Sequence, residues 1–171
     1  MPTIKIKMLN KSIATPQIID KGEWIDLRAA ESIEYKGPYT IQARKDVERK
    51  VIFSHHVLPL GVAMELPKGY EAVVITRSST FKNFNVILVN SEGVIDNPYN
   101  GDNDQWFAHL IAFGDGCISE GDRICQFRIQ LSQKATRWQK LKWLFSNGVK
   151  IKIVESLDNS DRGGQGSTGI K

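Results

Sequence analysis

Apolar and polar residues alternate along several short stretches of this chain. The first stretch is Ile4 to Met8, where isoleucines alternate with lysines, and the clearest runs from Arg123 to Leu131. There, Phe127, Ile129 and Leu131 face one way, while the polar residues between them and before Phe127 face the other. Because side chains alternate between the two faces of a strand, this period of two predicts β-strands. The same alternation predicts a last strand over residues 149–153.

Other apolar runs are continuous rather than alternating. Tyr70 to Thr76 is a β-branched run entered through the turn-forming sequence Pro67-Lys68-Gly69. Val86 to Val89 and Phe107 to Phe113 are uninterrupted apolar runs, which predicts two fully buried strands. Many short strands separated by Gly, Pro and Asn turns predict an all-β fold, a sandwich or a jelly-roll barrel, rather than an α/β fold.

Two stretches depart from the strand pattern. Arg44 to Lys50 carries mixed charges and is typical of a solvated loop or short helix. Thr136 to Phe145 spaces its apolar residues at helical intervals, within a segment from Lys134 to Lys152 that has six basic residues and no acidic one. One interpretation is a surface helix with its apolar side on the sheet. The other is a docking surface for an acidic protein partner.

Bulk composition predicts a single soluble domain. The chain has 171 residues, of which 41% are hydrophobic and 25% charged, and its net charge of +4 is compatible with a polyanionic ligand. Cys117 and Cys125 form no disulfide framework and no zinc-ligand spacing, so both are expected to be buried thiols in a reducing compartment. The start of the chain has no signal-peptide pattern, and no apolar run is long enough to span a bilayer. A cytoplasmic protein with no membrane association is expected.

The C-terminal residues have the composition of a flexible phosphate-binding arm. From Asn159 onward the chain is polar and rich in glycine, which predicts a β domain over residues 1–158 and an arm over residues 159–171. The arm combines Arg162 and several glycines with the hydroxyls of Ser167 and Thr168, groups that suit phosphate oxygens. It lacks the Gly-Lys-Ser/Thr ending of a P-loop. An arm with this chemistry is expected to close over a site built elsewhere.

An internal carboxylate is the main candidate for catalysis. Asp96 lies just before the turn formed by Asn97 and Pro98, at a place where a ligand can reach its side chain. A carboxylate there can accept a proton from water and orient it toward phosphorus. The alternative is an Asp that only bonds to its own turn backbone. Tyr99, three residues further on, offers a flat ring to a sugar or base.

Five segments occur in an order that resembles the five motifs of the trimeric dUTPases, from about Asp26 to Gly169. They are Trp24 to Leu27, Gly69-Tyr70 with Arg77-Ser78-Ser79, Asn90 to Tyr99, Gly121 to Phe127, and Arg162 to Gly169. The resemblance implies a jelly-roll-like distorted β barrel assembled as a homotrimer with shared active sites. It also implies hydrolysis of dUTP to dUMP and pyrophosphate with Mg²⁺ as cofactor, and it requires no nucleic acid.

The same resemblance assigns roles to individual residues. Asp96 would activate the water that attacks the α-phosphorus, and Asp26 would hold hydrated Mg²⁺ through water. In the family, a β-hairpin at the position of Asn90 recognises uracil through its backbone, and the tyrosine matching Tyr99 leaves no room for a 2′-hydroxyl. The full set of implied substrate-binding residues is Arg77, Ser78, Ser79, Asn90, Gly93, Val94, Ile95, Tyr99, Gln126, Arg162, Gly164, Gln165, Gly166, Ser167 and Thr168.

The chain departs from the family pattern at Gln165, at Trp24 and at the pair Asn97-Pro98, and it also carries two longer segments. Gln165 stands where the family usually carries a phenylalanine that stacks on uracil, and Trp24 is a candidate to replace that ring. The pair Asn97-Pro98 stiffens the turn before Tyr99. Residues 40–53 and 136–148 look like insertions, and the second of these is the segment expected to meet a protein partner.

Two other functions are compatible with parts of the pattern. A dCTP deaminase on the same scaffold would need a positioned glutamate, but the acidic residues that follow Tyr99 most closely are Asp102 and Asp104, and the next glutamate is Glu120. A nucleotide-binding regulatory module acting through a protein partner would use the 136–148 insertion.

The three histidines, His55, His56 and His109, are expected to be structural or exposed.

Overall fold

A computed structural model describes residues 1–20, 22–41 and 50–164 of the chain. These residues form thirteen strands and two short helices. The strands are β1 (Thr3–Met8), β2 (Ile25–Arg28), β3 (Ile33–Tyr35), β4 (Tyr39–Ile41), β5 (Lys50–Ile52), β6 (Ser54–Glu65), β7 (Tyr70–Thr76), β8 (Val86–Leu88), β9 (Gly93–Ile95), β10 (Gln105–Ala112), β11 (Gly116–Ile118), β12 (Arg123–Leu131) and β13 (Lys150–Val154). The helices are α1 (Thr80–Phe84) and α2 (Arg137–Leu144).

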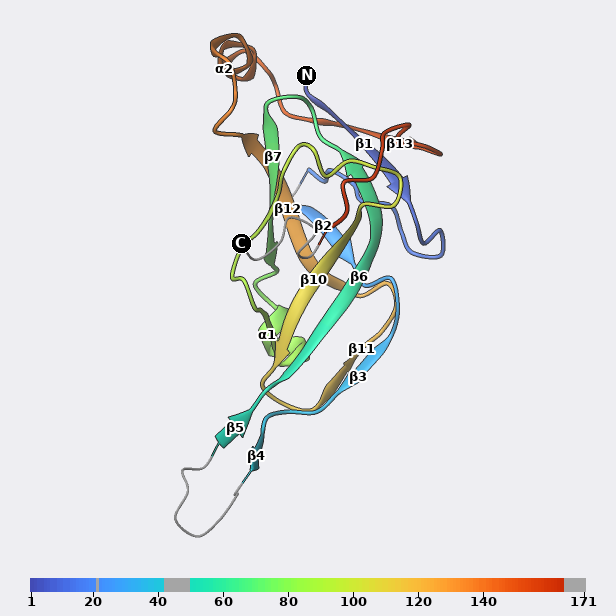
Figure 1. The fold of residues 1–171 in the computed structure, drawn as a ribbon, viewed down its shortest axis with the longest axis vertical. Coiled ribbons are helices and arrows are strands. Elements are labelled where there is room, and N and C mark those ends of the chain that lie inside the picture. The colour runs from blue at the N-terminus through green and yellow to red at the C-terminus, as the bar shows by residue number, and fades with distance from the viewer. Residues whose placement is uncertain (21, 42–49, 165–171) are drawn as a thin grey trace.

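Two sheets make up the body of the molecule (Figure 1). The larger sheet has the strand order β13-β1-β6-β10-β8, and the other has the order β2-β12-β7-β9. β1 and β13 are parallel, whereas β6 is antiparallel to both of its neighbours. Two small ladders, β3 with β11 and β4 with β5, extend from this body. The all-β fold class expected from the sequence is confirmed.

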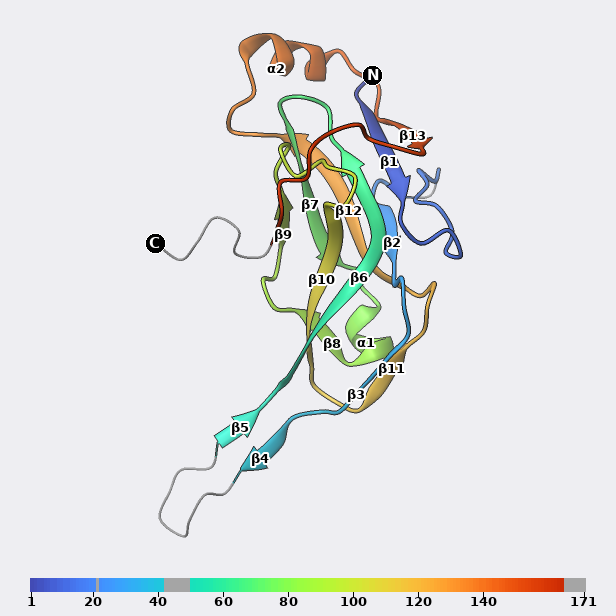
Figure 2. The ribbon, with the colours of Figure 1, turned by 45° about the vertical axis from the view of Figure 1, so that its right-hand side comes forward.

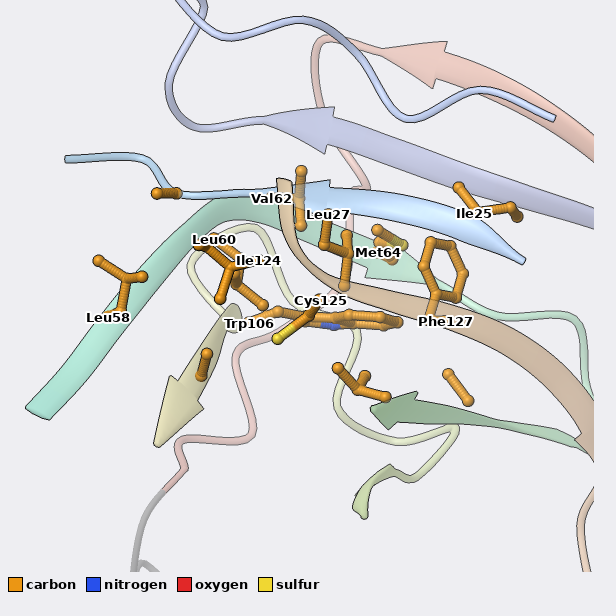
Figure 3. Close-up of a cluster of buried hydrophobic side chains, with 14 of the residues drawn as sticks. Ile25, Leu27, Leu58, Leu60, Val62, Met64, Trp106, Ile124, Cys125 and Phe127 are labelled. Carbon is orange, nitrogen blue, oxygen red and sulfur yellow. The ribbon is translucent and has the colours of Figure 1, made fainter. Parts of the chain in front are cut away.

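The two sheets enclose one hydrophobic core. Its largest fully buried side chains are Trp106 on β10 and Phe127 on β12, whose rings meet edge to face at 5.2 Å. Leu27, Leu60 and Ile124 fill the space around them (Figure 3). Contact between β10 and β12 therefore joins the two sheets, and burial of these apolar side chains is the main force that stabilises the fold.

Most predicted strands are present, but two are less buried than their sequences indicate. β12 has the predicted bounds, and its Phe127 and Ile129 face the core. The runs starting at Val86 and Phe107 were expected to be fully buried, and that prediction is wrong. Ile87 is 38% exposed, and along β10 every second side chain is only partly buried. The physical reason is that no other layer formed by the described residues covers the outer face of this sheet.

The helix predicted over residues 136–145 is present as α2, but its packing differs from the prediction. Thr136 caps it with a capping box, accepting a hydrogen bond from the backbone N–H of Gln139. None of its residues is buried: Trp138 is 74% exposed and Phe145, at its C-cap, is 78% exposed. Only Trp143 packs on the core, edge to face with Tyr70. The expectation that the apolar side of this helix covers the sheet is therefore wrong.

The two presumed insertions lie at opposite ends of the molecule. The β4–β5 ladder projects from one end and α2 lies at the other, close to the N-terminus (Figure 2). Of the mixed-charge segment 44–50, only Lys50 is among the described residues, and it begins β5.

The two cysteines differ in burial. Cys125 is buried as expected, but the prediction for Cys117 is wrong because its position on the short ladder β3–β11 leaves it exposed.

Candidate active site

A cavity of about 260 Å³ lies beside β9, between the two sheets. Val74, Leu88 and Trp106 form apolar parts of its wall, and His109 also lines it. Most of the polar lining comes from the two segments that the sequence singled out. These lining residues are Asn90, Gly93, Val94, Ile95, Asp96, Tyr99, Arg162, Gly163 and Gly164. The predicted nucleoside-binding segment and the start of the arm therefore meet at one cavity, which is large enough for a base and a sugar.

Asp96 lies at the edge of this cavity, directly after β9. Its side chain is 58% exposed, and its Oδ2 atom lies 3.4 Å from Nη1 of Arg162. The backbone N–H of Tyr99 donates to the carbonyl of Asp96, and the side chain of Asn97 donates to the carbonyls of Leu66 and Pro67. These bonds hold the turn without using the Asp96 carboxylate. The carboxylate is thus available to a ligand, and the alternative of a purely turn-forming Asp is not supported.

Tyr99 presents its ring to the cavity and is anchored through its hydroxyl. The hydroxyl donates to the backbone carbonyl of Gln105 at 2.7 Å. Burial raises the pKa of Tyr99, and the nearby carboxylates of Asp104 and Asp161 raise it further. A Cβ atom on Gly164 would come within 3.1 Å of the hydroxyl, so the arm passes close to the ring. Tyr99 is therefore a fixed, uncharged wall of the cavity.

The turn at Asn90 links the two sheets. β8 pairs with β10, whereas β9 pairs with β7, so the chain crosses from one sheet to the other between Leu88 and Gly93. Ser91 adopts a left-handed backbone conformation, with φ of 56°, to make this turn. The family's β-hairpin is therefore not formed by a ladder between β8 and β9 in the described residues. Asn90 and the backbone of Gly93 still line the cavity.

A second polar cluster surrounds Asp26 on the other sheet. Its Oδ1 atom forms an ion pair with Nε of Arg77 at 2.8 Å, and its Oδ2 atom accepts a hydrogen bond from Nη1 of Arg123 at 3.1 Å. Strand register brings these groups together, because Asp26 is opposite Gln126 on β12 and Gln126 is opposite Ile75 on β7. The cluster carries one negative and two positive charges, which suits phosphate oxygens.

Thr80 fixes the backbone that presents Arg77. Its buried hydroxyl accepts from the N–H of Arg77 at 3.1 Å and donates to the carbonyl of Ile124 at 2.8 Å. Ser79 is the N-cap of α1, and Ser78 is exposed in the turn before it. The end of β7 is therefore tied to β12, and the exposed Ser78 follows Arg77 directly.

The two clusters remain separate in the single chain. Asp26, Arg77 and Gln126 are not among the residues that line the cavity beside β9. Trp24, the candidate stacking ring, does not line it either and instead packs on the guanidinium of Arg128 at 4.9 Å. Gln165, Gly166, Ser167 and Thr168 lie outside the described residues.

Asp26 fits a magnesium ion that arrives with a triphosphate better than a resident ion. Both of its oxygens are paired with guanidinium groups, and its side chain is only 24% exposed. The described residues contain no group of three or more His, Cys, Asp and Glu side chains suited to a metal. A bare dication would be repelled by the two arginines, whereas a magnesium–triphosphate complex carries net negative charge and keeps several waters on the metal.

Sequence analysis missed several residues of both clusters. Arg123 lies in the predicted segment from Gly121 to Phe127, but its pairing with Asp26 depends on the register of β2 with β12. Leu88, Trp106 and His109 looked like ordinary strand residues, and nothing in their local sequence marks them as cavity walls. The expectation that His109 is structural or exposed is thus incomplete, since His109 also contributes to the cavity.

Comparison with known proteins agrees with this geometry. The sequence model of one protein family, described as dUTPase, matches residues 32–169. The chain belongs to the dUTPase family. It is 48% identical over 168 residues to an SPbeta prophage-derived deoxyuridine 5′-triphosphate nucleotidohydrolase of Bacillus subtilis, covering 98% of this chain and 99% of that one. It is also 30% identical to the deoxyuridine 5′-triphosphate nucleotidohydrolase of Helicobacter pylori strain P12, over 98% of this chain and 97% of that one.

Solved dUTPase structures share the fold. The dUTPase of Streptococcus mutans matches with a TM-score of 0.59 at 20% identity, over 77% of this chain and 98% of that one. The dUTPase of phage phi11 of S. aureus, described with a structural Mg(II) ion, matches with a TM-score of 0.59 at 16% identity, over 78% of this chain and 93% of that one. Among the described residues of this dUTPase-family chain, no helix has the length and apolar character needed to cross a membrane.

Proposed function

We propose that the protein hydrolyses dUTP to dUMP and pyrophosphate. The observation that carries the proposal is the cavity beside β9, where Tyr99, Asn90 and the strand backbone form a nucleoside-sized pocket with Asp96 and Arg162 at its edge. Membership of the dUTPase family and the close B. subtilis relative support it.

In the proposed reaction, the carboxylate of Asp96 takes a proton from a water molecule. The water oxygen forms a bond to the α-phosphorus, and the bond from that phosphorus to the bridging oxygen breaks, so that pyrophosphate leaves. Arg162, paired with Asp96 in the free protein, moves to the phosphates when the substrate binds. Tyr99 supplies the wall against the sugar, and the backbone of Gly93 to Ile95 with Asn90 supplies the polar groups for the base.

Arg77, Ser78, Ser79 and Gln126 are proposed to bind the triphosphate. Asp26 pairs with two arginines, and it would hold the hydrated Mg²⁺ that accompanies the nucleotide through water. When bound, Mg²⁺ neutralises charge on the phosphates. Ser167, Thr168, Gly164, Gly166 and Gln165 are proposed to enclose the phosphates from the arm.

The separation of the two clusters supports a homotrimer with shared sites. Neither cluster by itself holds both a nucleoside pocket and a phosphate-binding set in the described residues. The outer face of β6, β10 and β8 also exposes apolar side chains, among them Val57, Ile87 and Val89. Covering this face with other copies of the chain would bury it and bring the clusters of different copies together.

The experiment that tests the activity is pyrophosphate release with Mg²⁺ from dUTP, dCTP, dTTP and UTP in parallel, with Asp96→Asn as the control. We expect turnover of dUTP alone and loss of turnover in the variant. Ammonia release from dCTP would favour the deaminase instead, but none of the described residues that line the cavity is a glutamate. No turnover of any nucleotide by folded protein would overturn the proposal.

A mixing experiment tests the shared sites. Asp96→Asn and Arg77→Ala are each expected to be inactive, because each removes one half of the site. If the halves meet between copies, co-refolding the two variants restores part of the activity, since some sites then combine two intact halves. Sedimentation analysis should give the mass of three chains. A monomer with full activity would contradict the shared site.

We also propose that α2 docks an acidic, amphipathic segment of a protein partner. Trp138, Leu141, Leu144 and Phe145 are exposed, and residues of α2 line a cavity of about 760 Å³ together with Met1, Lys68 and Tyr70. The absence of acidic residues between Lys134 and Lys152 favours a negatively charged partner. A hollow surface favours an inserted protein side chain over a flat membrane.

A model peptide tests this surface. An acidic amphipathic helical peptide should bind the wild type, and Trp138→Ala should weaken the binding without changing dUTP hydrolysis. A basic peptide with the same apolar residues is the matched control. Equal binding of both peptides, or binding only to anionic lipid vesicles, would overturn the proposal.

The expected compartment is the cytoplasm, where the exposed thiol of Cys117 stays reduced.

A further inference from the structure

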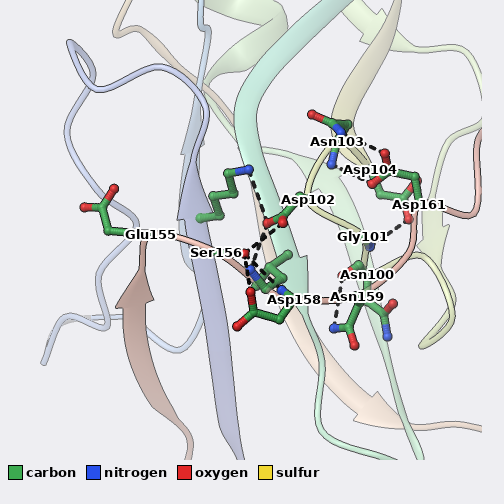
Figure 4. A network of polar contacts seen from close by, with 12 residues as sticks. Asn100, Gly101, Asp102, Asn103, Asp104, Glu155, Ser156, Asp158, Asn159 and Asp161 are labelled. Carbon is green, nitrogen blue, oxygen red and sulfur yellow. Dashed lines mark hydrogen bonds and ion pairs between the residues drawn. The ribbon is translucent and has the colours of Figure 1, made fainter.

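The start of the C-terminal arm is bonded to the loop that joins β9 and β10 (Figure 4). The backbone N–H of Asn103 donates to Oδ1 of Asp161 at 2.8 Å, and its side-chain amide donates to Oδ2 at 2.7 Å. The side-chain amide of Asn159 donates to the carbonyl of Asn100 at 3.4 Å. These contacts join residues almost sixty positions apart, so residues 159–163 are part of the folded body rather than a free tail.

Asp104 is the buried member of this contact. It is only 1% exposed, and its carboxylate accepts hydrogen bonds from backbone N–H groups. The donors are Gly101 at 2.8 Å, Arg162 at 3.0 Å and Gly163 at 3.1 Å. A carboxylate removed from water is costly unless such donors surround it. Because two of the three donors belong to the arm, the arm must be docked for Asp104 to keep its hydrogen bonds.

Gly101 allows the loop and the arm to approach each other. A Cβ atom added at Gly101 would overlap the backbone of Asp161, so this position accepts no side chain unless the arm moves. The adjacent Asp102 carboxylate holds an earlier part of the chain, because it accepts from the N–H of Leu157 at 2.8 Å and the hydroxyl of Ser156 at 2.8 Å. The loop thus holds the chain at two successive points.

Docking of the arm sets the position of Arg162. Its backbone N–H is held by Asp104, while its guanidinium extends to Asp96 at 3.4 Å. We propose that Asp104 is a positioning residue, which fixes the base of the arm so that Arg162 is held at the edge of the nucleotide cavity. The kinetic consequence rests on the proposed function, whereas the docking itself does not.

Asp104→Asn is the most specific substitution for testing the contact between Asp104 and the arm. Each oxygen of Asp104 accepts from backbone N–H groups, Oδ1 from Gly163 and Oδ2 from Gly101, and Arg162 contacts both. In an amide, one of these acceptors becomes an NH₂ group that faces a donor in either orientation. Asp102→Asn is the matched control, because it removes the same charge from the same loop without touching Arg162 or Gly163.

Tryptic cleavage after Arg162 reports the docking directly. The product, residues 1–162, is followed by intact-mass spectrometry well below the melting temperature of each variant, which keeps global unfolding out of the result. Loss of a charge-assisted hydrogen bond predicts cleavage at least about tenfold faster in Asp104→Asn. Asp102→Asn should be cleaved at the wild-type rate. Equal rates in wild type and Asp104→Asn would overturn the proposal.

Kinetics then connect the docking to Arg162. Asp104→Asn should lower kcat/KM for dUTP by about tenfold, while Asp102→Asn leaves it unchanged. In an Arg162→Ala background, Asp104→Asn should cause no further loss, because both changes remove the same interaction. A full further loss in that background would overturn the link to Arg162. If the wild type hydrolyses no nucleotide, the proposed function fails, and the cleavage rates still decide the role of Asp104.

Discussion

Arg162 lies 3.4 Å from Asp96 through its guanidinium, although the two residues are 66 positions apart in the sequence. Their side chains are 38% and 58% exposed, so the pair is screened by water and contributes little to stability. Its importance is positional. It places a phosphate-binding cation next to the proposed water-activating carboxylate before any substrate is present.

Replacement of Arg162 should affect activity and not folding. We expect Arg162→Ala to lower kcat/KM for dUTP by roughly 10²-fold to 10³-fold, because it removes electrostatic stabilisation of charge on the phosphates. The melting temperature should stay unchanged. Arg162→Lys keeps the charge without the planar fork and should recover only part of the loss. An alanine variant with wild-type kcat/KM would exclude Arg162 from the site.

The ring and the hydroxyl of Tyr99 should have separable effects. Tyr99→Phe removes the bond to the Gln105 carbonyl and should lower the free energy of unfolding by about 1 kcal/mol. Because the ring remains, preference for dUTP over UTP should persist, whereas Tyr99→Ala should lose that preference. Urea unfolding and parallel pyrophosphate assays measure the two effects. Equal loss of preference in both variants would assign selectivity to the hydroxyl.

His109 should make the protein less stable in mild acid. Its ring stacks on His55 at 5.6 Å, and burial, helped by the charge of His55, lowers the pKa of His109 below 6.5. The unfolded chain therefore binds a proton more readily than the folded chain as pH falls through 6.5, and the free energy of unfolding decreases over that interval.

Denaturant unfolding between pH 8 and pH 5 measures this effect, in the range where an ordinary histidine titrates. The wild type should lose stability on acidification, and His109→Gln should lose less, because glutamine does not titrate. His55→Gln should give an intermediate response, since it removes the charge next to His109 but leaves the burial. Identical pH profiles for wild type and His109→Gln would assign the acid sensitivity to other groups.

The two cysteines should differ strongly in reactivity. Cys117 is exposed, whereas burial raises the pKa of the Cys125 thiol to about 12. Because the thiolate is the reactive form, a disulfide reagent at pH 8 should modify one thiol rapidly and the second only after denaturation. Cys117→Ser should remove the fast phase, and Cys125→Ser should leave it in place. Two fast thiols in the folded wild type would contradict the buried position of Cys125.

Local sequence was sufficient for six of the thirteen strands among the described residues, although not for β6, the longest, and for the types of residue in the site. A period of two around Phe127 depends only on the chain itself, so β12 was predicted with the correct bounds. The turn before Tyr99 and the basic, glycine-rich start of the arm were likewise visible in the sequence. The order of these segments was enough to indicate the dUTPase family, to which the chain belongs.

Tertiary structure decided which of these side chains meet. Asp26 pairs with Arg77 and Arg123 because three strands adopt one register, and periodicity within a strand specifies its buried face but not its partner. Asp104 meets the arm because a loop and a distant segment satisfy each other's backbone groups. The exposed face of α2 is equally invisible in sequence, because helical spacing identifies an apolar side without showing whether anything covers it.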